Sequence, residues 1–89
     1  MNPTQREAVT INILKQLDAV HPLGMKASSL LTGCHEDDLR FIDQPRLNSL
    51  LSDLQEQEFV DCGGSGPVPE LKRYKRTVKA RAWLAERGV

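Results

Sequence analysis

The feature that most constrains the fold is a change in hydrophobic periodicity near residue 58. Before it, leucines recur at the spacing of an amphipathic helix over about 44–57. After it, the runs 59–62 and 71–76 have the composition of short strands. The segment 63–69 between them contains three glycines, which suits a hairpin tip longer than a tight turn. The sequence therefore predicts a helix that leads directly into a β-hairpin.

Local capping signals predict three further helices. Thr4 and Glu7 have the spacing of a capping box, and Asn2 is the alternative cap of the same helix. Gly33 is expected to close a short second helix, and Thr77 to cap the last one. We therefore expect an α+β fold that is mostly helical, with a three-helix core, a β-hairpin and a C-terminal helix. The predicted helices cover about 4–20, 27–32, 44–57 and 78–87, and the last is expected to bury Trp83 with one or two of Val78, Ala80 and Leu84.

The segment between the second and third helices is acidic. Residues 36–38 are all acidic, and they precede an apolar stretch over 39–42. Because acidic side chains stabilise the positive N-terminus of a helix, we expect a single helical turn here. Asp43 or Gln44 then caps the leucine-striped helix, and the proline that follows fits the first turn of this helix.

Length and composition indicate an ordinary globular chain. Its 89 residues suit one domain, which we take to span 1–89. No apolar run approaches the roughly 20 residues of a membrane helix, and the N-terminus lacks the pattern of a signal peptide. A cytoplasmic location is therefore expected, with Cys34 and Cys62 kept as reduced thiols.

The net charge is zero, but the charges are divided unequally along the chain. Residues 1–69 carry five basic and ten acidic side chains, whereas residues 70–89 carry seven basic and two acidic ones. Such a split suggests that one end of the protein meets something anionic. Mutual neutralisation of the two ends, within one molecule or across a dimer, explains it equally well.

One stretch carries a family resemblance. The pattern Leu47-x-x-Leu50-Leu51-x-x-Leu54 leads into Phe59-Val60, and Tyr74-x-x-Thr77 opens the last helix. Together with the order of the predicted elements, this resembles the winged helix-turn-helix superfamily of transcription regulators, as found in small bacterial or phage DNA-binding domains. Three features depart from that pattern: the long acidic connection 33–43, the charged Arg76 at a position that is usually apolar, and the absence of a strong net positive charge.

The resemblance implies sequence-specific binding of double-stranded DNA by a small transcription regulator. The third helix would enter the major groove, and the hairpin would act as a wing that contacts phosphates. Arginine suits guanine, whereas glutamine and asparagine suit adenine. Base contacts are then expected from Gln44, Arg46, Asn48, Ser49 and Ser52. Phosphate contacts are expected from Lys72, Arg73, Lys75 and Arg76.

Each of these surfaces also has a simpler explanation. The polar helix face suits plain solvation, and the hairpin cations suit an edge strand protected from aggregation. The alternative function is a non-catalytic winged-helix module that binds a protein partner and no DNA. A further alternative is a homodimer that pairs through the first and last helices. The third helix discriminates between DNA and a protein partner. If Asp53, Glu56 and the acidic insert share a face with Arg46, that face would repel DNA and favour a protein partner. Hairpin cations aligned with Gln44, Arg46 and Asn48 would instead favour DNA.

No group of residues predicts catalysis or a cofactor. Cys34, His35, Cys62 and His21 could supply zinc ligands, but their spacing fits no structural zinc pattern. The glycine cluster lies between two strands, so it differs from a phosphate-binding loop. No nucleophile–base pair is evident either. We therefore expect neither enzymatic activity nor a metal site nor a cofactor.

Overall fold

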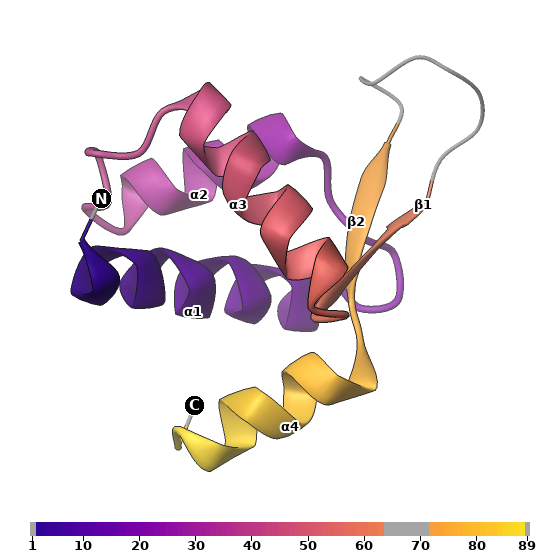
Figure 1. Ribbon diagram of the computed structural model, residues 1–89. Helices are drawn as coiled ribbons and strands as arrows, with labels where there is room; N and C mark the ends of the chain where they lie inside the picture. The colour runs from indigo at the N-terminus through magenta and orange to yellow at the C-terminus, as the bar shows by residue number, and fades with distance from the viewer. Residues whose placement is uncertain (1, 64–71, 89) are drawn as a thin grey trace.

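The computed structural model describes residues 2–63 and 72–88. Its elements, in chain order, are α1 (Pro3–Val20), α2 (Ala27–Glu36), α3 (Gln44–Glu56), β1 (Val60–Gly63), β2 (Arg73–Arg76) and α4 (Val78–Glu86) (Figure 1). Within these residues, four helices and one two-stranded antiparallel sheet confirm the predicted α+β, mostly helical class. The predicted hairpin tip, apart from Gly63, and the predicted start of the second strand lie outside the described residues.

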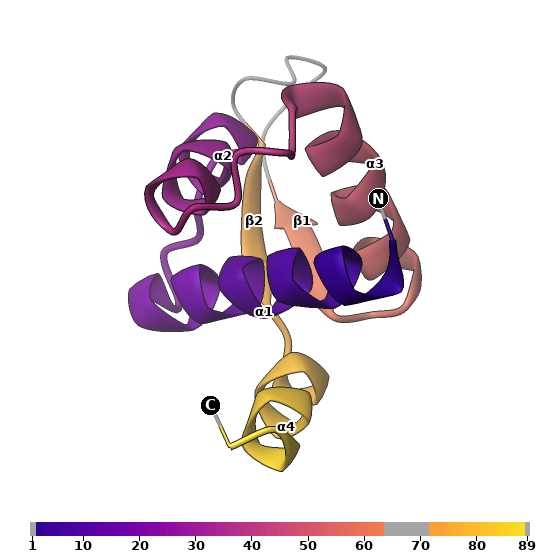
Figure 2. The same cartoon turned by 90° about the vertical axis from the view of Figure 1, so that its left-hand side faces the viewer.

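α1 runs through the middle of the molecule. α2 and α3 lie on one side of it, α4 lies on the other, and the hairpin extends away at one end (Figures 1 and 2). None of the helices in the described part of the chain is both long and apolar enough to cross a membrane. The apolar stripes of the helices meet in one core, whose fully buried members include Val9, Ile13, Leu14, Leu17, Leu30, Ile42, Leu47, Leu50, Leu51, Val60 and Leu84.

The first helix begins with a capping box two residues before the predicted pair, at the alternative cap Asn2. The side chain of Asn2 accepts a hydrogen bond from the backbone N–H of Gln5 at 2.8 Å, and the Gln5 side chain accepts one from the backbone N–H of Asn2 at 3.1 Å. The predicted pair of Thr4 and Glu7 is therefore wrong. Asn2 supplies an equally good side-chain oxygen and places Pro3 at the first helical position, where proline is favoured.

The caps of α3 and α4 agree with the prediction. Asp43 accepts a hydrogen bond from the backbone N–H of Arg46 at 3.0 Å. Thr77 caps α4 with an equivalent bond of 3.2 Å. In α4, burial is confirmed for Ala80 and Leu84 and is partial for Trp83, whereas Val78 is 84% exposed.

α2 is one turn longer than the predicted range 27–32. The helix passes through Gly33 and ends at Glu36. A Cβ at Gly33 would collide with the amide of Gln16, which donates a hydrogen bond to the carbonyl of Leu30 at 3.2 Å. Gly33 therefore permits close packing of the Gln16 side chain and does not end the helix.

The acidic residues 36–38 end α2 and do not begin a helix. Asp38 adopts a left-handed φ of 62°, which an aspartate tolerates better than most residues. Residues 39–42 form a turn, and a ring nitrogen of His35 lies 2.8 Å from the carbonyl oxygen of Ile42. The predicted helical turn is wrong because the longer α2 ends within the acidic residues, which therefore cannot begin a new helix.

The hairpin is tied to the start of α2. Cys62 of β1 pairs with Tyr74 of β2. On its other side, Tyr74 exchanges two backbone hydrogen bonds, of 2.8 and 2.9 Å, with Met25. Because Met25 immediately precedes the capping residue of α2, these bonds fix the first turn of α2 beside the hairpin.

Candidate nucleic-acid interface

A broad hollow lies between the starts of α2 and α3 and the hairpin. It has a volume of about 680 Å³ and is open to solvent. We call it the hairpin groove. Its lining consists of Lys26, Ala27 and Ser28 from the start of α2, Gln44 and Asn48 from the first two turns of α3, Tyr74 of β2, and Lys72 just before β2.

Two amide side chains form the α3 wall of the hairpin groove. Gln44 and Asn48 are one helical turn apart, so their side chains lie side by side. The Gln44 Nε2 donates a hydrogen bond to the Asn48 Oδ1 at 2.9 Å. The bond holds both amides in a fixed relation and leaves each with further hydrogen-bonding capacity.

The other two walls of the hairpin groove contribute positive charge. Lys26 occupies the capping position of α2, where no side chain caps the helix. The first backbone N–H groups of a helix have no intrahelical partner, and they add to the positive potential there. Lys72 faces Lys26 from the hairpin. Among the residues that the structure describes, neither lysine pairs with a carboxylate and no acidic residue lines the groove.

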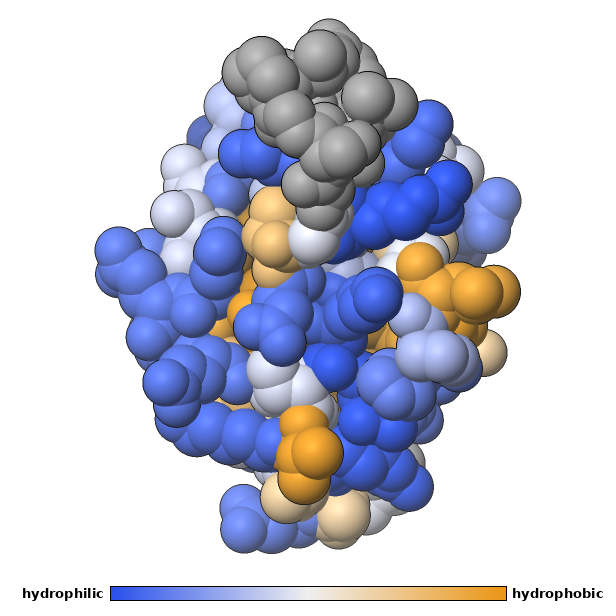
Figure 3. Space-filling model, turned by 90° about the vertical axis from the view of Figure 1, so that its right-hand side faces the viewer, coloured by the Kyte–Doolittle hydropathy of each residue, from blue (hydrophilic) through white to orange (hydrophobic). Residues whose placement is uncertain are grey.

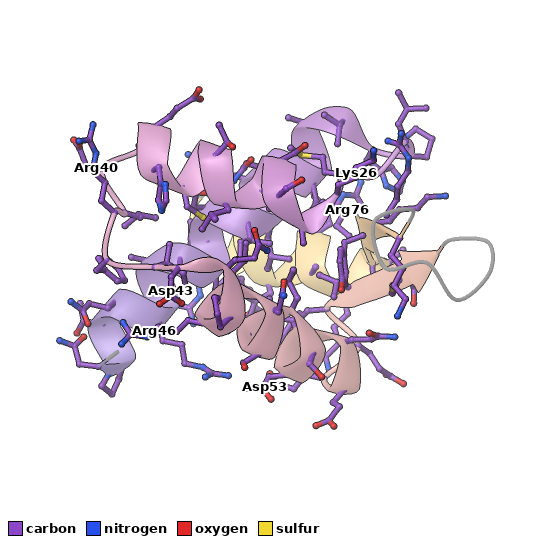
Figure 4. All side chains as sticks on the ribbon, turned by 90° about the horizontal axis from the view of Figure 1, so that it is seen from above. Lys26, Arg40, Asp43, Arg46, Asp53 and Arg76 are labelled. Atoms are coloured by element: carbon purple, nitrogen blue, oxygen red, sulfur yellow. The ribbon has the colours of Figure 1, made fainter. Side chains whose placement is uncertain are left out.

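The opposite flank of α3 is ion-paired. The Arg46 Nε lies 3.9 Å from a carboxylate oxygen of Asp43, and the Arg46 guanidinium also donates to the carbonyl of Phe41 at 3.3 Å. Further along, Asp53 accepts a hydrogen bond from Arg6 of α1 at 2.9 Å. In Figure 4, Arg46 and Asp43 lie together at one end of the molecule and Lys26 lies at the other, while Asp53 points away from α2. We call this side the paired flank.

The five predicted base-contacting residues are thus divided over α3. Gln44 and Asn48 line the hairpin groove. Arg46 and Ser49 line a smaller hollow of about 300 Å³ on the paired flank, together with Asp53. Ser52 is exposed and lines neither hollow.

The four predicted phosphate-contacting residues are divided in a similar way. Lys72 lines the hairpin groove, and Arg73 and Lys75 are exposed. Side chains alternate between the faces of a strand, so Arg73 and Lys75 share the face of β2 that Tyr74 does not occupy. Figure 3 shows that the hairpin side of the molecule is covered mainly by hydrophilic residues.

Arg76 is directed into the molecule. Its guanidinium donates to Asp18 of α1 at 2.5 Å, and its side chain is only 16% exposed. Arg81 of α4 also approaches Asp18, at 3.8 Å. This ion pair lies at the base of the hairpin. Arg76 therefore anchors the hairpin and is not exposed to a phosphate.

Sequence reasoning missed three groups of the hairpin groove: Lys26, Ser28 and Tyr74. Lys26 is isolated from other basic residues in the sequence, so only its position before α2 could have indicated it. Burial raises the pKa of Tyr74 above 10.0, and the neighbouring Cys62 adds to the rise. The Tyr74 hydroxyl therefore stays protonated at neutral pH and can donate or accept a hydrogen bond.

The thiols are placed apart from one another. Cys34 is buried in the core, and its sulfur donates to the Asn12 side chain at 3.3 Å. Burial, followed by the nearby charge of Asp37, raises the pKa of Cys34 to about 11, so the thiol is a poor nucleophile. Within residues 2–63 and 72–88, no three His, Cys, Asp or Glu side chains come together as a metal site would require.

No protein-family model matches the chain, and no curated protein matches it either. Function is therefore inferred from the geometry and charge of the hairpin groove. The groove offers fixed hydrogen-bonding groups on a helix, flanked on two sides by cations.

Proposed function

We propose that this chain is a winged helix-turn-helix protein that binds double-stranded DNA, as a small transcription regulator, through the hairpin groove. Gln44 and Asn48 face the base edges in the major groove. Lys26 and Lys72, with Arg73 and Lys75 on the outer hairpin, neutralise phosphates on either side. The observation that carries the proposal is the convergence of cations from α2 and the hairpin on the polar first turns of α3.

The dimensions of the elements support this proposal. A single α-helix fits the major groove of B-DNA, where base edges present distinct donors and acceptors. In helix-turn-helix proteins, the residues near the start of the recognition helix contact the bases. Gln44 and Asn48 occupy the first two turns of α3. The element order, with a hairpin and a closing helix after α3, fits a winged helix-turn-helix fold.

Asp53 shares the paired flank with Arg46, the arrangement expected to repel DNA, so the proposal places the duplex on the other side of α3. Asp43 pairs with Arg46 and Asp53 with Arg6, both on the paired flank. Asp18 is paired with Arg76 beneath the hairpin. These carboxylates are neutralised by neighbours and lie outside the hairpin groove, so they present no concentrated negative charge to a duplex held there.

The test is a titration of fluorescently end-labelled random-sequence duplex DNA, followed by anisotropy at 50 and 200 mM salt. The label belongs on the DNA because Trp83 packs against Phe59 and Arg87, outside the hairpin groove. We expect affinity that falls steeply with salt, since each neutralised phosphate releases counterions. The double variant Lys26→Ala/Lys72→Ala should bind more weakly and lower the salt slope by about two.

Lys15→Ala is the matched control, because Lys15 is an exposed lysine of α1 that does not line the hairpin groove. It removes one charge, as each of the single variants Lys26→Ala and Lys72→Ala does, and should leave the salt slope nearly unchanged. Equal losses in the control and in each single variant would indicate that only net charge matters. Absence of binding at 50 mM salt would exclude duplex DNA and favour the protein-interaction module, to be sought by pull-down.

A further inference from the structure

We infer that the hairpin groove reads the adenine of an A·T base pair, and that Gln44 and Asn48 do so as one hydrogen-bonded unit. This inference rests on the proposed DNA binding and specifies the class of sequence that is bound. It is carried by the hydrogen bond that joins the two amides and by the separation of Arg46 from the groove.

The amide pair has a defined pattern of free groups. A primary amide has one carbonyl oxygen that accepts and two N–H groups that donate. The bond from Gln44 Nε2 to Asn48 Oδ1 uses one donor of Gln44. The Gln44 carbonyl oxygen, its second N–H and the two N–H groups of Asn48 remain, so the α3 wall combines one acceptor with neighbouring donors.

That combination can pair with both major-groove groups of adenine, whereas guanine has no major-groove donor for the free carbonyl oxygen. In the major groove, adenine presents the acceptor N7 beside the donor N6, whereas guanine presents the two acceptors N7 and O6. A carbonyl oxygen opposite guanine O6 would leave two desolvated acceptors facing one another. An unpaired polar group of this kind is costly once water is excluded.

The residue best suited to guanine lies elsewhere. Arg46 is on the paired flank, where it contacts Asp43 and the carbonyl of Phe41. Lys26 and Lys72 do line the groove, but they belong to its α2 and hairpin walls. Their positions at the edges of the groove suit phosphates, and their single charged tips lack the planar fork that pairs with guanine.

The experiment selects binding sites from a random duplex library with the wild-type chain and with Asn48→Ala, Gln44→Ala and Arg46→Ala. The wild-type site should contain an A·T pair whose replacement by G·C weakens binding about 10- to 100-fold. 7-Deazaadenine at that position lacks the N7 acceptor and should weaken binding as well. Asn48→Ala and Gln44→Ala should lose the preference, whereas Arg46→Ala should select the same site.

Two controls keep the outcomes distinct. Asn48 is exposed, so Asn48→Ala should unfold at the same temperature as the wild type. Lys15→Ala, outside the hairpin groove, should keep both the selected site and the salt-dependent binding to random duplex. A site centred on G·C, or one whose selection depends on Arg46 or a lysine, would overturn the inference while leaving DNA binding intact. Loss of all duplex binding by the wild type would overturn both.

Discussion

The two long sides of α3 carry side chains of similar polarity, yet they differ in what surrounds them. On the hairpin groove, Gln44 and Asn48 meet lysines from two other elements. On the paired flank, Arg46 and Asp53 meet oppositely charged partners and are neutralised. Because an ion pair presents little net charge to a ligand, the groove is the side of α3 with the more concentrated positive charge.

The comparison also separates two roles of positive charge. Arg6 and Arg76 connect elements that are far apart in the sequence, through Asp53 and Asp18. Lys26 and Lys72 have no carboxylate partner among the described residues. The basic residues therefore form two groups. Some connect elements through ion pairs, and others line the hairpin groove without a carboxylate partner among the described residues.

The largest loss of stability should come from a substitution in the core that supports both sides of α3. Leu51 is fully buried beneath the helix. Leu51→Ala should lower the free energy of unfolding by about 2–5 kcal/mol, because it leaves a cavity in the core. Urea denaturation measures this loss, and DNA binding should weaken in step with it. Ser52→Ala, at the exposed neighbouring position, should change stability by less than about 0.5 kcal/mol.

A smaller effect should distinguish two hairpin cations. Arg76→Ala breaks the contact with Asp18 and should cost about 1–2 kcal/mol, since the pair is only partly buried. Arg73→Ala removes an exposed cation of the same strand, so it should leave stability unchanged and weaken binding to all DNA sequences alike. Thermal denaturation and anisotropy check the two variants together. A stable Arg76→Ala variant with weakened DNA binding would place Arg76 at the phosphates instead.

Removing the cap of α3 should lower the stability of the chain. Asp43→Ala removes the bond to the backbone N–H of Arg46 and should destabilise the chain by about 1 kcal/mol. Asp43→Asn retains a capping oxygen and removes only the charge beside Arg46, so its melting temperature should stay near that of the wild type. If both variants improve DNA binding through a freed Arg46, the division between the two sides of α3 is weaker than the structure indicates.

The smallest change in stability should come from breaking an ion pair on the paired flank. A double-mutant cycle of Arg6→Ala and Asp53→Ala measures the coupling of this exposed ion pair, in which both side chains are nearly half exposed. We expect about 0.2–1 kcal/mol, falling at high salt. Neither single variant should alter the site selected from a DNA library. A changed site would show that the paired flank takes part in recognition.

Much of the fold follows from local sequence signals. Leu47, Leu50, Leu51 and Leu54 recur at helical spacing, and they are buried as that spacing predicts. Asp43 and Thr77 cap helices because their short polar side chains reach the backbone a few residues ahead. The prediction that Gly33 ends α2 was wrong. A glycine is needed at this position because the Gln16 side chain of α1 packs where a Cβ would lie.

The candidate site was predictable only in part, for a physical reason. The sequence alone determined the helices, the hairpin and the polar face of α3, since hydrophobic spacing and caps act within a few residues. Only the tertiary structure decided which polar residues are free. Asp53 is 47 positions from Arg6, and Asp18 is 58 from Arg76. Such pairs form only when packing brings distant elements together. Packing likewise places Lys26 and Lys72 in the lining of the same groove.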